Sequence, residues 1–348
     1  MSLSHETLRP LTYSTVPFEY CDDRKLWSLA TRFVPTSADD GQGKTTCSLL
    51  LCAGISLQKE AWLPVIKRLY KLASQANSRV YIHSVWVIER PNHGDAALLN
   101  EVQLREHYRV MFPSRQYATA IRAFLASDHL SERERANLIA VGHSGGGGAI
   151  IEAIEPAKLN LPVSRLILAE APHIGQECWT PMKQIYQSVK ASNARRRTNW
   201  ASVDEAMSYF KQRLPCKAYH PEVWQIMKET YFREDPQDPR RVTTKTTVEQ
   251  ETACFLDDGT HLATLGYLRS MYQILPTHLI LGTEEDIWLP EIYRHQRENV
   301  KRDHNDVASV SYIEGAGHYL PFQMPEELAV EIARLLNDYG GSHAGARL

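Results

Sequence analysis

A short apolar strand that runs through a glycine-rich turn into a helix is the most constraining feature of this sequence. Residues 138–149 read Leu-Ile-Ala-Val-Gly-His-Ser-Gly-Gly-Gly-Gly-Ala. The glycines at 142 and 146 leave room for the strand and the helix to approach each other on either side of Ser144. A turn this tight forces its central residue into a strained backbone conformation. The segment therefore predicts a sheet with a strained serine at the end of one strand.

Apolar, β-branched runs alternate with segments of helical periodicity along much of the chain. This alternation predicts an α/β fold, a mostly parallel sheet with helices on both faces. The predicted strands span residues 46–53, 80–88, 137–141, 163–169, 277–281 and 308–313. The predicted helices span residues 61–73, 116–126, 146–153 and 325–338. Two weaker runs at 11–17 and 26–33 could form an antiparallel hairpin at the edge of the sheet.

The alternation stops between residues 172 and 272. This stretch is polar, rich in Lys, Arg, Gln and Trp, and predicts several helices and no strand. An insertion between two strands of an open α/β sheet lies over the strand ends, where such folds place their sites. We therefore expect a first core segment over 1–171, a helical cap over 172–272, a second core segment over 273–339 and a mobile tail over 340–348.

The turn also carries chemistry. Gly142-His143-Ser144-Gly145-Gly146 matches the Gly-x-Ser-x-Gly nucleophile elbow, and its place between a strand and a helix favours the α/β-hydrolase fold. A serine hydroxyl needs a base to take its proton. His318 is the predicted base, because it follows the last strand and comes after the serine in the chain. His143 is interpreted as a packing residue, and His93 as a packing or loop residue.

Two further roles are needed in such a site. The backbone N–H groups of Gly145 and Ile55 are the predicted donors to an oxyanion, because they follow the nucleophile and the strand 46–53. The acid that orients the base is ambiguous. Glu170 ends the strand 163–169, and Asp286 follows the strand 277–281, so either could reach the far nitrogen of His318.

Composition excludes several classes of partner. The formal charge is -2, with 39 Lys and Arg against 41 Asp and Glu, so we expect no binding to nucleic acid or to an anionic membrane. No apolar run reaches the ~20 residues of a membrane span. The six cysteines show no metal-ligand spacing and indicate a reducing compartment. No metal or cofactor is expected. The basic run at 195–197 is either a solvated helix face or a site for an anionic group such as phosphate.

The chain ends in Ala346-Arg347-Leu348, which fits the small-basic-leucine form of a peroxisomal signal. The Gly and Ser residues that precede it predict a mobile tail. We therefore expect a peroxisomal import receptor as a partner, and otherwise a cytoplasmic location.

Several segments resemble the fungal peroxisomal α/β-hydrolases, a family that includes the yeast peroxisomal lipase, hydrolases of host-selective toxin pathways and the acyl-CoA hydrolase of mycophenolic acid biosynthesis. The segments are Ala53-Gly-Ile-Ser-Leu-Gln-Lys-Glu-Ala-Trp62, Asn92-His-Gly-Asp95, Gly142-His-Ser-Gly-Gly146, Leu166-Ile-Leu-Ala-Glu170 and Gly317-His-Tyr-Leu-Pro321. The resemblance implies an intracellular serine hydrolase that acts on acyl esters or acyl-CoA thioesters, often in secondary metabolism. It also favours Glu170 as the acid, since relatives tend to carry Glu-Pro or Asp-Pro at this position.

Two other functions remain open at this point. The same residues could serve intramolecular acyl transfer or cyclisation, because the difference depends on whether the cap excludes water. The chain could also be a catalytically silent binding protein on a hydrolase scaffold. The identity of the acyl substrate and the oligomeric state, a homodimer included, are not predicted.

Overall fold

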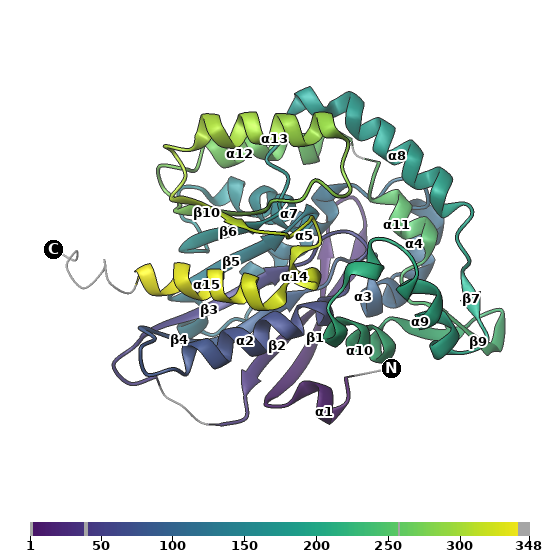
Figure 1. The fold of residues 1–348 in the computed structure, drawn as a ribbon, viewed down its shortest axis with the longest axis horizontal. Helices are drawn as coiled ribbons and strands as arrows, with labels where there is room; N and C mark the ends of the chain where they lie inside the picture. Colours follow the sequence, from purple (N-terminus) through teal and green to yellow (C-terminus); the bar gives the residue numbers. More distant parts are fainter. Residues whose placement is uncertain (1–2, 38–40, 257, 340–348) are drawn as a thin grey trace.

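The computed structural model describes residues 3–37, 41–256 and 258–339. Eight strands form one sheet in the order β1-β2-β4-β3-β5-β6-β10-β11 (Figure 1). Their bounds are β1 Leu11–Cys21, β2 Lys25–Pro35, β3 Thr45–Cys52, β4 Val80–Ile88, β5 Leu138–His143, β6 Arg165–Ala169, β10 Thr277–Gly282 and β11 Ser309–Ile313. Six of these strands run parallel to one another: β4, β3, β5, β6, β10 and β11. The remaining two, β1 and β2, form the antiparallel hairpin at one edge. The predicted α/β fold and its edge hairpin are confirmed. The predicted tail 340–348 lies outside the described residues.

Helices fill most of the connections between these strands. The longer ones are α2 Leu63–Ala73, α5 Ser114–Ala126, α7 Gly145–Ile154, α13 Pro290–Asp303 and α15 Pro325–Tyr339. Shorter ones are α1 His5–Leu8, α3 Gly94–Leu99, α4 Glu101–His107, α6 Glu132–Arg135 and α14 Leu320–Gln323. Each of the four helices predicted from periodicity is present, within a few residues of its predicted bounds.

The segment between β6 and β10 differs from the predicted one. It contains the helices α8 Trp179–Asn193, α9 Val203–Lys211, α10 Pro221–Thr230, α11 Val248–Ala253 and α12 Thr260–Arg269. It also contains a small sheet, in the order β7-β9-β8, formed by β7 Asn199–Trp200, β8 Phe232–Asp235 and β9 Asp238–Thr244. The prediction of no strand here was wrong, because these strands are short and partly exposed and so carry no apolar run.

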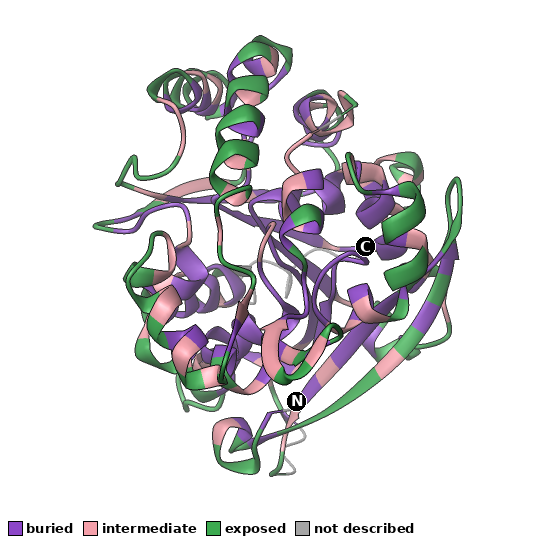
Figure 2. Ribbon diagram, turned by 90° about the vertical axis from the view of Figure 1, so that its right-hand side faces the viewer, coloured by how far each residue is buried: buried purple, intermediate pink, exposed green. Residues whose placement is uncertain are grey.

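The main sheet is buried on both faces by helices. Neighbouring side chains along a strand point to opposite faces, so one strand contributes to two apolar clusters. Leu49 and Leu51 of β3 pack in one apolar cluster with α2 and α15. Leu50 and Cys52 pack in the other, with α5, α7 and α12. Figure 2 shows the buried sheet between helices whose outer faces are exposed. None of the described helices combines the length and the apolar character needed to cross a bilayer.

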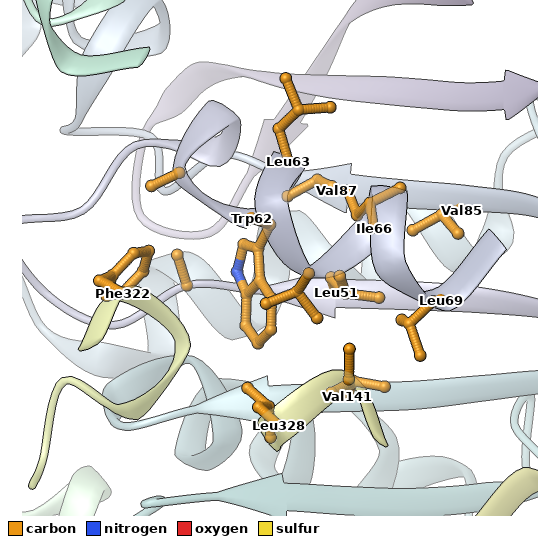
Figure 3. Packing of buried hydrophobic residues seen from close by; sticks show 14 of the residues in the cluster. Leu51, Trp62, Leu63, Ile66, Leu69, Val85, Val87, Val141, Phe322 and Leu328 are labelled. Atoms are coloured by element: carbon orange, nitrogen blue, oxygen red, sulfur yellow. The ribbon is translucent and has the colours of Figure 1, made fainter. Parts of the chain in front are cut away.

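Trp62 anchors the turn after β3 to this core. Its side chain is fully buried at the start of α2, beside Leu51 and Phe322 (Figure 3). The rings of Trp62 and Phe322 lie 6.5 Å apart, so the helix α14 that follows His318 packs on the helix that follows β3. Two loops that are far apart in the sequence are thereby fixed side by side.

Candidate active site

Ser144 lies at the turn between β5 and α7, with φ 51° and ψ −133°. The neighbouring glycines are required by close approach. A Cβ on Gly142 would lie 2.3 Å from the Cα of Gly147, and one on Gly146 would lie 2.4 Å from the carbonyl oxygen of Cys52. The turn therefore holds the serine side chain at the carboxyl end of β5, as the sequence predicted.

His318 lies on the loop between β11 and α14, and its ring meets the serine. Its Nε2 is 2.8 Å from the Oγ of Ser144, and both residues are buried. His143 holds this loop in place, because its Nε2 lies 2.8 Å from the carbonyl oxygen of His318. A carbonyl only accepts, so His143 donates from Nε2. Burial, together with the nearby ring of His318, lowers the pKa of His143 to about 3 and keeps it neutral.

The two candidate acids occupy different places around His318. The Oε2 of Glu170 lies 3.3 Å from the Nδ1 of His318, and its Oε1 accepts a hydrogen bond of 2.6 Å from the N–H of Gly282. Asp286 instead accepts from the backbone N–H of His318 at 3.0 Å and from Tyr293 at 3.3 Å. The structure therefore brings Ser144, His318 and Glu170 into one chain of contacts, and Asp286 supports the backbone of the loop.

The turn after β3 lies directly against the serine. A Cβ on Gly54 would lie 2.8 Å from the Cβ of Ser144. Ile55 borders the same pocket as Ser144 and Gly145. The N–H of Gly145 is in the first turn of α7, where backbone donors have no acceptor within the helix. Both predicted N–H groups therefore belong to residues that border the pocket at the serine.

The sequence predicts a packing or loop residue at His93, and the structure places it in the loop after β4 with two polar contacts. The N–H of Ser56 donates to its Nε2 at 2.8 Å, and its Nδ1 lies 2.9 Å from the Oδ1 of Asn92. Asn92 in turn donates to the carbonyl oxygen of Gln250 in α11 at 3.0 Å. The turn that carries Ile55 is therefore tied to both the main sheet and the inserted segment. Only the Asn92-His-Gly-Asp95 run gave a signal of this in the sequence.

A network of buried ion pairs also holds the turn after β3 in place. Lys59 lies 2.6 Å from Glu60, 3.2 Å from Glu89 and 3.5 Å from Asp95, and Lys245 lies 2.7 Å from Asp95. Burial lowers the pKa of Lys59, but the surrounding carboxylates more than offset this effect and raise it. The lysine is therefore charged, and it joins the turn after β3 to the loop after β4.

Backbone strain is concentrated around the serine. Among the described residues, the non-glycine positions with positive φ are Ser56 (69°), Ser144 (51°) and Glu170 (48°). They follow β3, β5 and β6, which are adjacent in the sheet. Strain of this kind persists where the surroundings impose it, and it is common at functional sites.

A narrow, mainly apolar pocket of about 40 Å³ opens beside Ser144. Side chains of the inserted segment and of α13 close it; they include Ile174, Met182, Phe255 and Ile292. Phe255 also borders a wider cavity of about 590 Å³, which reaches Ser56 and Tyr319. The site thus offers one tight apolar space and one open space.

The three arginines of the basic run at 195–197 have different surroundings in the structure. Arg196 pairs with Glu251 at 2.6 Å, and Arg197 pairs with Glu205 at 2.8 Å. Arg195 borders the wider cavity together with Arg213. Within the described residues, no group of three or more His, Cys, Asp or Glu side chains is arranged to hold a metal ion.

Comparisons with known proteins agree with this fold. The model of the alpha/beta hydrolase family matches residues 49–331. The chain is similar to the peroxisomal alpha-beta-hydrolase Lpx1 of Saccharomyces cerevisiae, with 17% identity, a TM-score of 0.75 and coverage of 98% of this chain and 91% of that one. It is also similar to the thioesterase domain from the curacin biosynthetic pathway (18% identity, TM-score 0.59, coverage 93% and 99%). A third similar structure is a thermophilic esterase from Thermogutta terrifontis (15% identity, TM-score 0.58, coverage 93% of this chain and 98% of that one). The search of curated proteins found no match. The chain belongs to the alpha/beta hydrolase family.

Proposed function

We propose that this protein is a serine hydrolase that cleaves carboxylic esters or thioesters with Ser144 as its nucleophile. The observation that carries the proposal is the contact of 2.8 Å between the Oγ of Ser144 and the Nε2 of His318. An acid at the opposite ring nitrogen, Glu170, supports it. A base in contact with the hydroxyl, and itself oriented by a third group, is the arrangement that activates a serine.

The proposed reaction has two stages. His318 takes the proton of Ser144 as the Oγ attacks the acyl carbon, and the carboxylate of Glu170 stabilises the imidazolium. The N–H groups of Gly145 and Ile55 donate to the oxyanion. His318 then protonates the departing alcohol or thiol, which leaves an acyl group on Ser144. Water attacks this ester by the same route and releases the acid.

Covalent labelling tests the nucleophile. We expect a fluorophosphonate probe to label the wild-type protein, and Ser144→Ala to abolish both labelling and hydrolysis of 4-nitrophenyl esters, with a loss of roughly 10⁴-fold or more. Ser114 is a second serine that borders the pocket, so Ser114→Ala is the matched control and should still be labelled. Full labelling of Ser144→Ala would contradict the proposal.

We further propose that the substrate is an acyl-CoA or a hydrophobic ester. The narrow apolar pocket suits an acyl group, and Arg195 and Arg213 border a cavity wide enough for a long anionic leaving group. Replacing both arginines by Gln should raise KM for an acyl-CoA and leave KM for an uncharged 4-nitrophenyl ester nearly unchanged. Arg197→Gln, which removes an arginine already paired with Glu205, is the control. An equal rise for both substrates would contradict this choice.

A peroxisomal location is the last part of the proposal. Its support is the terminal Ala346-Arg347-Leu348 and the similarity to a hydrolase described as peroxisomal. Deleting the three residues should leave hydrolysis intact and move a fluorescent fusion from peroxisomes to the cytosol of a fungal cell. A full-length fusion that is already cytosolic would contradict this location.

A further inference from the structure

Arg90 is a buried guanidinium beside the serine. It follows β4, only 4% of its surface is exposed, and it borders the narrow pocket together with Ser144 and Gly145. Its guanidinium carbon lies 4.6 Å from the centre of the Tyr117 ring, which supports the flat face of the group. Its Nη2 is 3.1 Å from the point where a Cβ on Gly145 would lie. The positive charge is therefore held next to the residue that follows the nucleophile.

No carboxylate neutralises this charge among the described residues. Arg90 forms no ion pair there, and its Nε is buried without a hydrogen-bond partner. The adjacent Glu89 is turned away, because its Oε2 lies at Lys59 and accepts from the N–H of Ala96. Cys254, which borders the same pocket, is close to Arg90. Burial raises the pKa of its thiol more than the charge of Arg90 lowers it, so the thiol is neutral and supplies no counter-charge. An unpaired buried charge is strongly destabilising, so its presence at the pocket indicates that a ligand supplies the missing anion.

The shape of the pocket selects the kind of anion. A guanidinium is planar and binds a carboxylate through two parallel N–H···O bonds. The narrow pocket is too small for a coenzyme or another bulky leaving group, whereas the wide cavity on the other side of Phe255 can take one. The group that enters beside Arg90 is therefore the acyl part of the substrate.

We infer that the acyl group carries a second carboxylate, which pairs with Arg90, so that the substrate is a half-ester or half-thioester of a dicarboxylic acid. This inference rests on the proposed hydrolysis at Ser144. It keeps an acyl-CoA within the substrate class and replaces the hydrophobic ester by an ester whose acyl group ends in a carboxylate. Apolar walls, Ile174 and Met182 among them, contact the carbon chain between the two carbonyl groups. Arg90 is then a residue that determines specificity.

The test compares matched pairs of substrates. The 4-nitrophenyl half-esters of succinate, glutarate and adipate are compared with the esters of butanoate, pentanoate and hexanoate, each corrected for the spontaneous hydrolysis measured with Ser144→Ala. We expect the wild-type protein to prefer at least one half-ester over its neutral partner by about tenfold or more in kcat/KM. Arg90→Met should lower that ratio about 100-fold, since it breaks a buried charge pair, and Arg90→Lys should restore part of it. Arg133, which also lies over a tyrosine ring but on the surface helix α6, supplies the control Arg133→Met, with an unchanged ratio.

The outcomes separate the inference from the proposed function. Hydrolysis without preference at any chain length, or the same ratio in Arg90→Met as in the wild type, would overturn the role of Arg90 and leave the serine hydrolase intact. If Arg90→Met does not fold, competitive inhibition of the wild-type protein by adipate, and not by hexanoate, decides the question. If Ser144 is neither labelled nor active, the proposed function fails. Calorimetric titration with adipate then tests Arg90 alone, and a lack of binding would overturn the inference.

Discussion

The indole Nε1 of Trp288 lies 3.0 Å from the Nδ1 of His318. An indole N–H can only donate, so this contact favours the tautomer of His318 with the proton on Nε2. The carboxylate of Glu170, 3.3 Å from the same nitrogen, can only accept and favours a proton on Nδ1. Only the second tautomer leaves Nε2 free to take the proton of Ser144. Trp288, which the sequence did not single out, therefore opposes the effect of Glu170 on His318, the proposed base.

Trp288→Phe should consequently raise kcat, because it removes the donor and keeps an aromatic ring. One hydrogen bond contributes about 1 kcal/mol, so the rise should be about fivefold or less. Steady-state kinetics at saturating ester measures it. Trp179→Phe, a change outside this contact, is the control. A fall of tenfold or more in Trp288→Phe would instead show that the indole supports the base.

The two acids should differ sharply in their amide variants. Glu170→Gln should lower kcat by up to roughly 10⁴-fold in a folded protein, because the ring of His318 loses its orienting carboxylate. Asp286→Asn should cost less than about tenfold, since one oxygen can still accept from the backbone N–H of His318. Both are measured with one ester at saturating concentration. The reverse ranking would assign the acid to Asp286.

His93 should act as a positioning residue for the turn that carries Ile55. Burial, with the nearby charge of Arg90, lowers its pKa well below the ordinary value, so its Nε2 stays free to accept from Ser56. His93→Leu leaves the half-buried N–H of Ser56 without a partner and should lower kcat about 10- to 100-fold with little change in KM. His93→Gln keeps an acceptor and should recover much of this loss. Equal losses in the two variants would indicate a purely steric role.

Glu134 should make stability depend on pH. Burial raises its pKa, but hydrogen bonds from Ser84, Arg32 and Ser131 outweigh this effect and lower it to about 2, from an unfolded value of 4.5. The folded state binds this proton less readily, so the stabilisation is complete above about pH 4.5 and is lost as the pH falls toward 2. It amounts to roughly 3 kcal/mol.

Urea unfolding between pH 6 and pH 2 measures this contribution. Glu134→Gln should be less stable at pH 6, and its free energy of unfolding should depend less on pH. Glu132→Gln, in the same short helix, should show the wild-type dependence. If the free energy of unfolding of Glu134→Gln depends on pH as strongly as that of the wild type, other groups cause the acid sensitivity.

The elements that carry strong local signals could be predicted from the sequence. Val80–Ile88 has the same bounds in the structure as in the prediction, because its apolar run is buried on both faces of the sheet. The turn at Ser144 could be predicted because only glycine fits the space beside it. The strands β8 and β9 could not, since their side chains are half exposed and their pairing decides their structure.

Contacts between distant segments account for the rest. Whether Glu170 or Asp286 reaches the ring of His318 depends on how the loop after β11 lies over two strand ends. The residues next to either carboxylate in the sequence do not predict this. The positions of Trp288 and His93 are likewise set by partners 30 and 37 residues away. Arg90 carries no motif, and its significance lies in a missing partner, which only the folded arrangement can reveal.

The three left-handed residues at the ends of β3, β5 and β6 have a consequence for how this protein could change. Glycine adopts such a conformation without strain, so Ser56→Gly or Ser144→Gly would relieve a cost of order 1 kcal/mol each. Ser56→Gly would keep the backbone N–H that donates to His93, whereas Ser144→Gly would remove the proposed nucleophile. If Ser144 is the nucleophile, as proposed, a selection for thermal tolerance alone would favour a change at this position that abolishes hydrolysis.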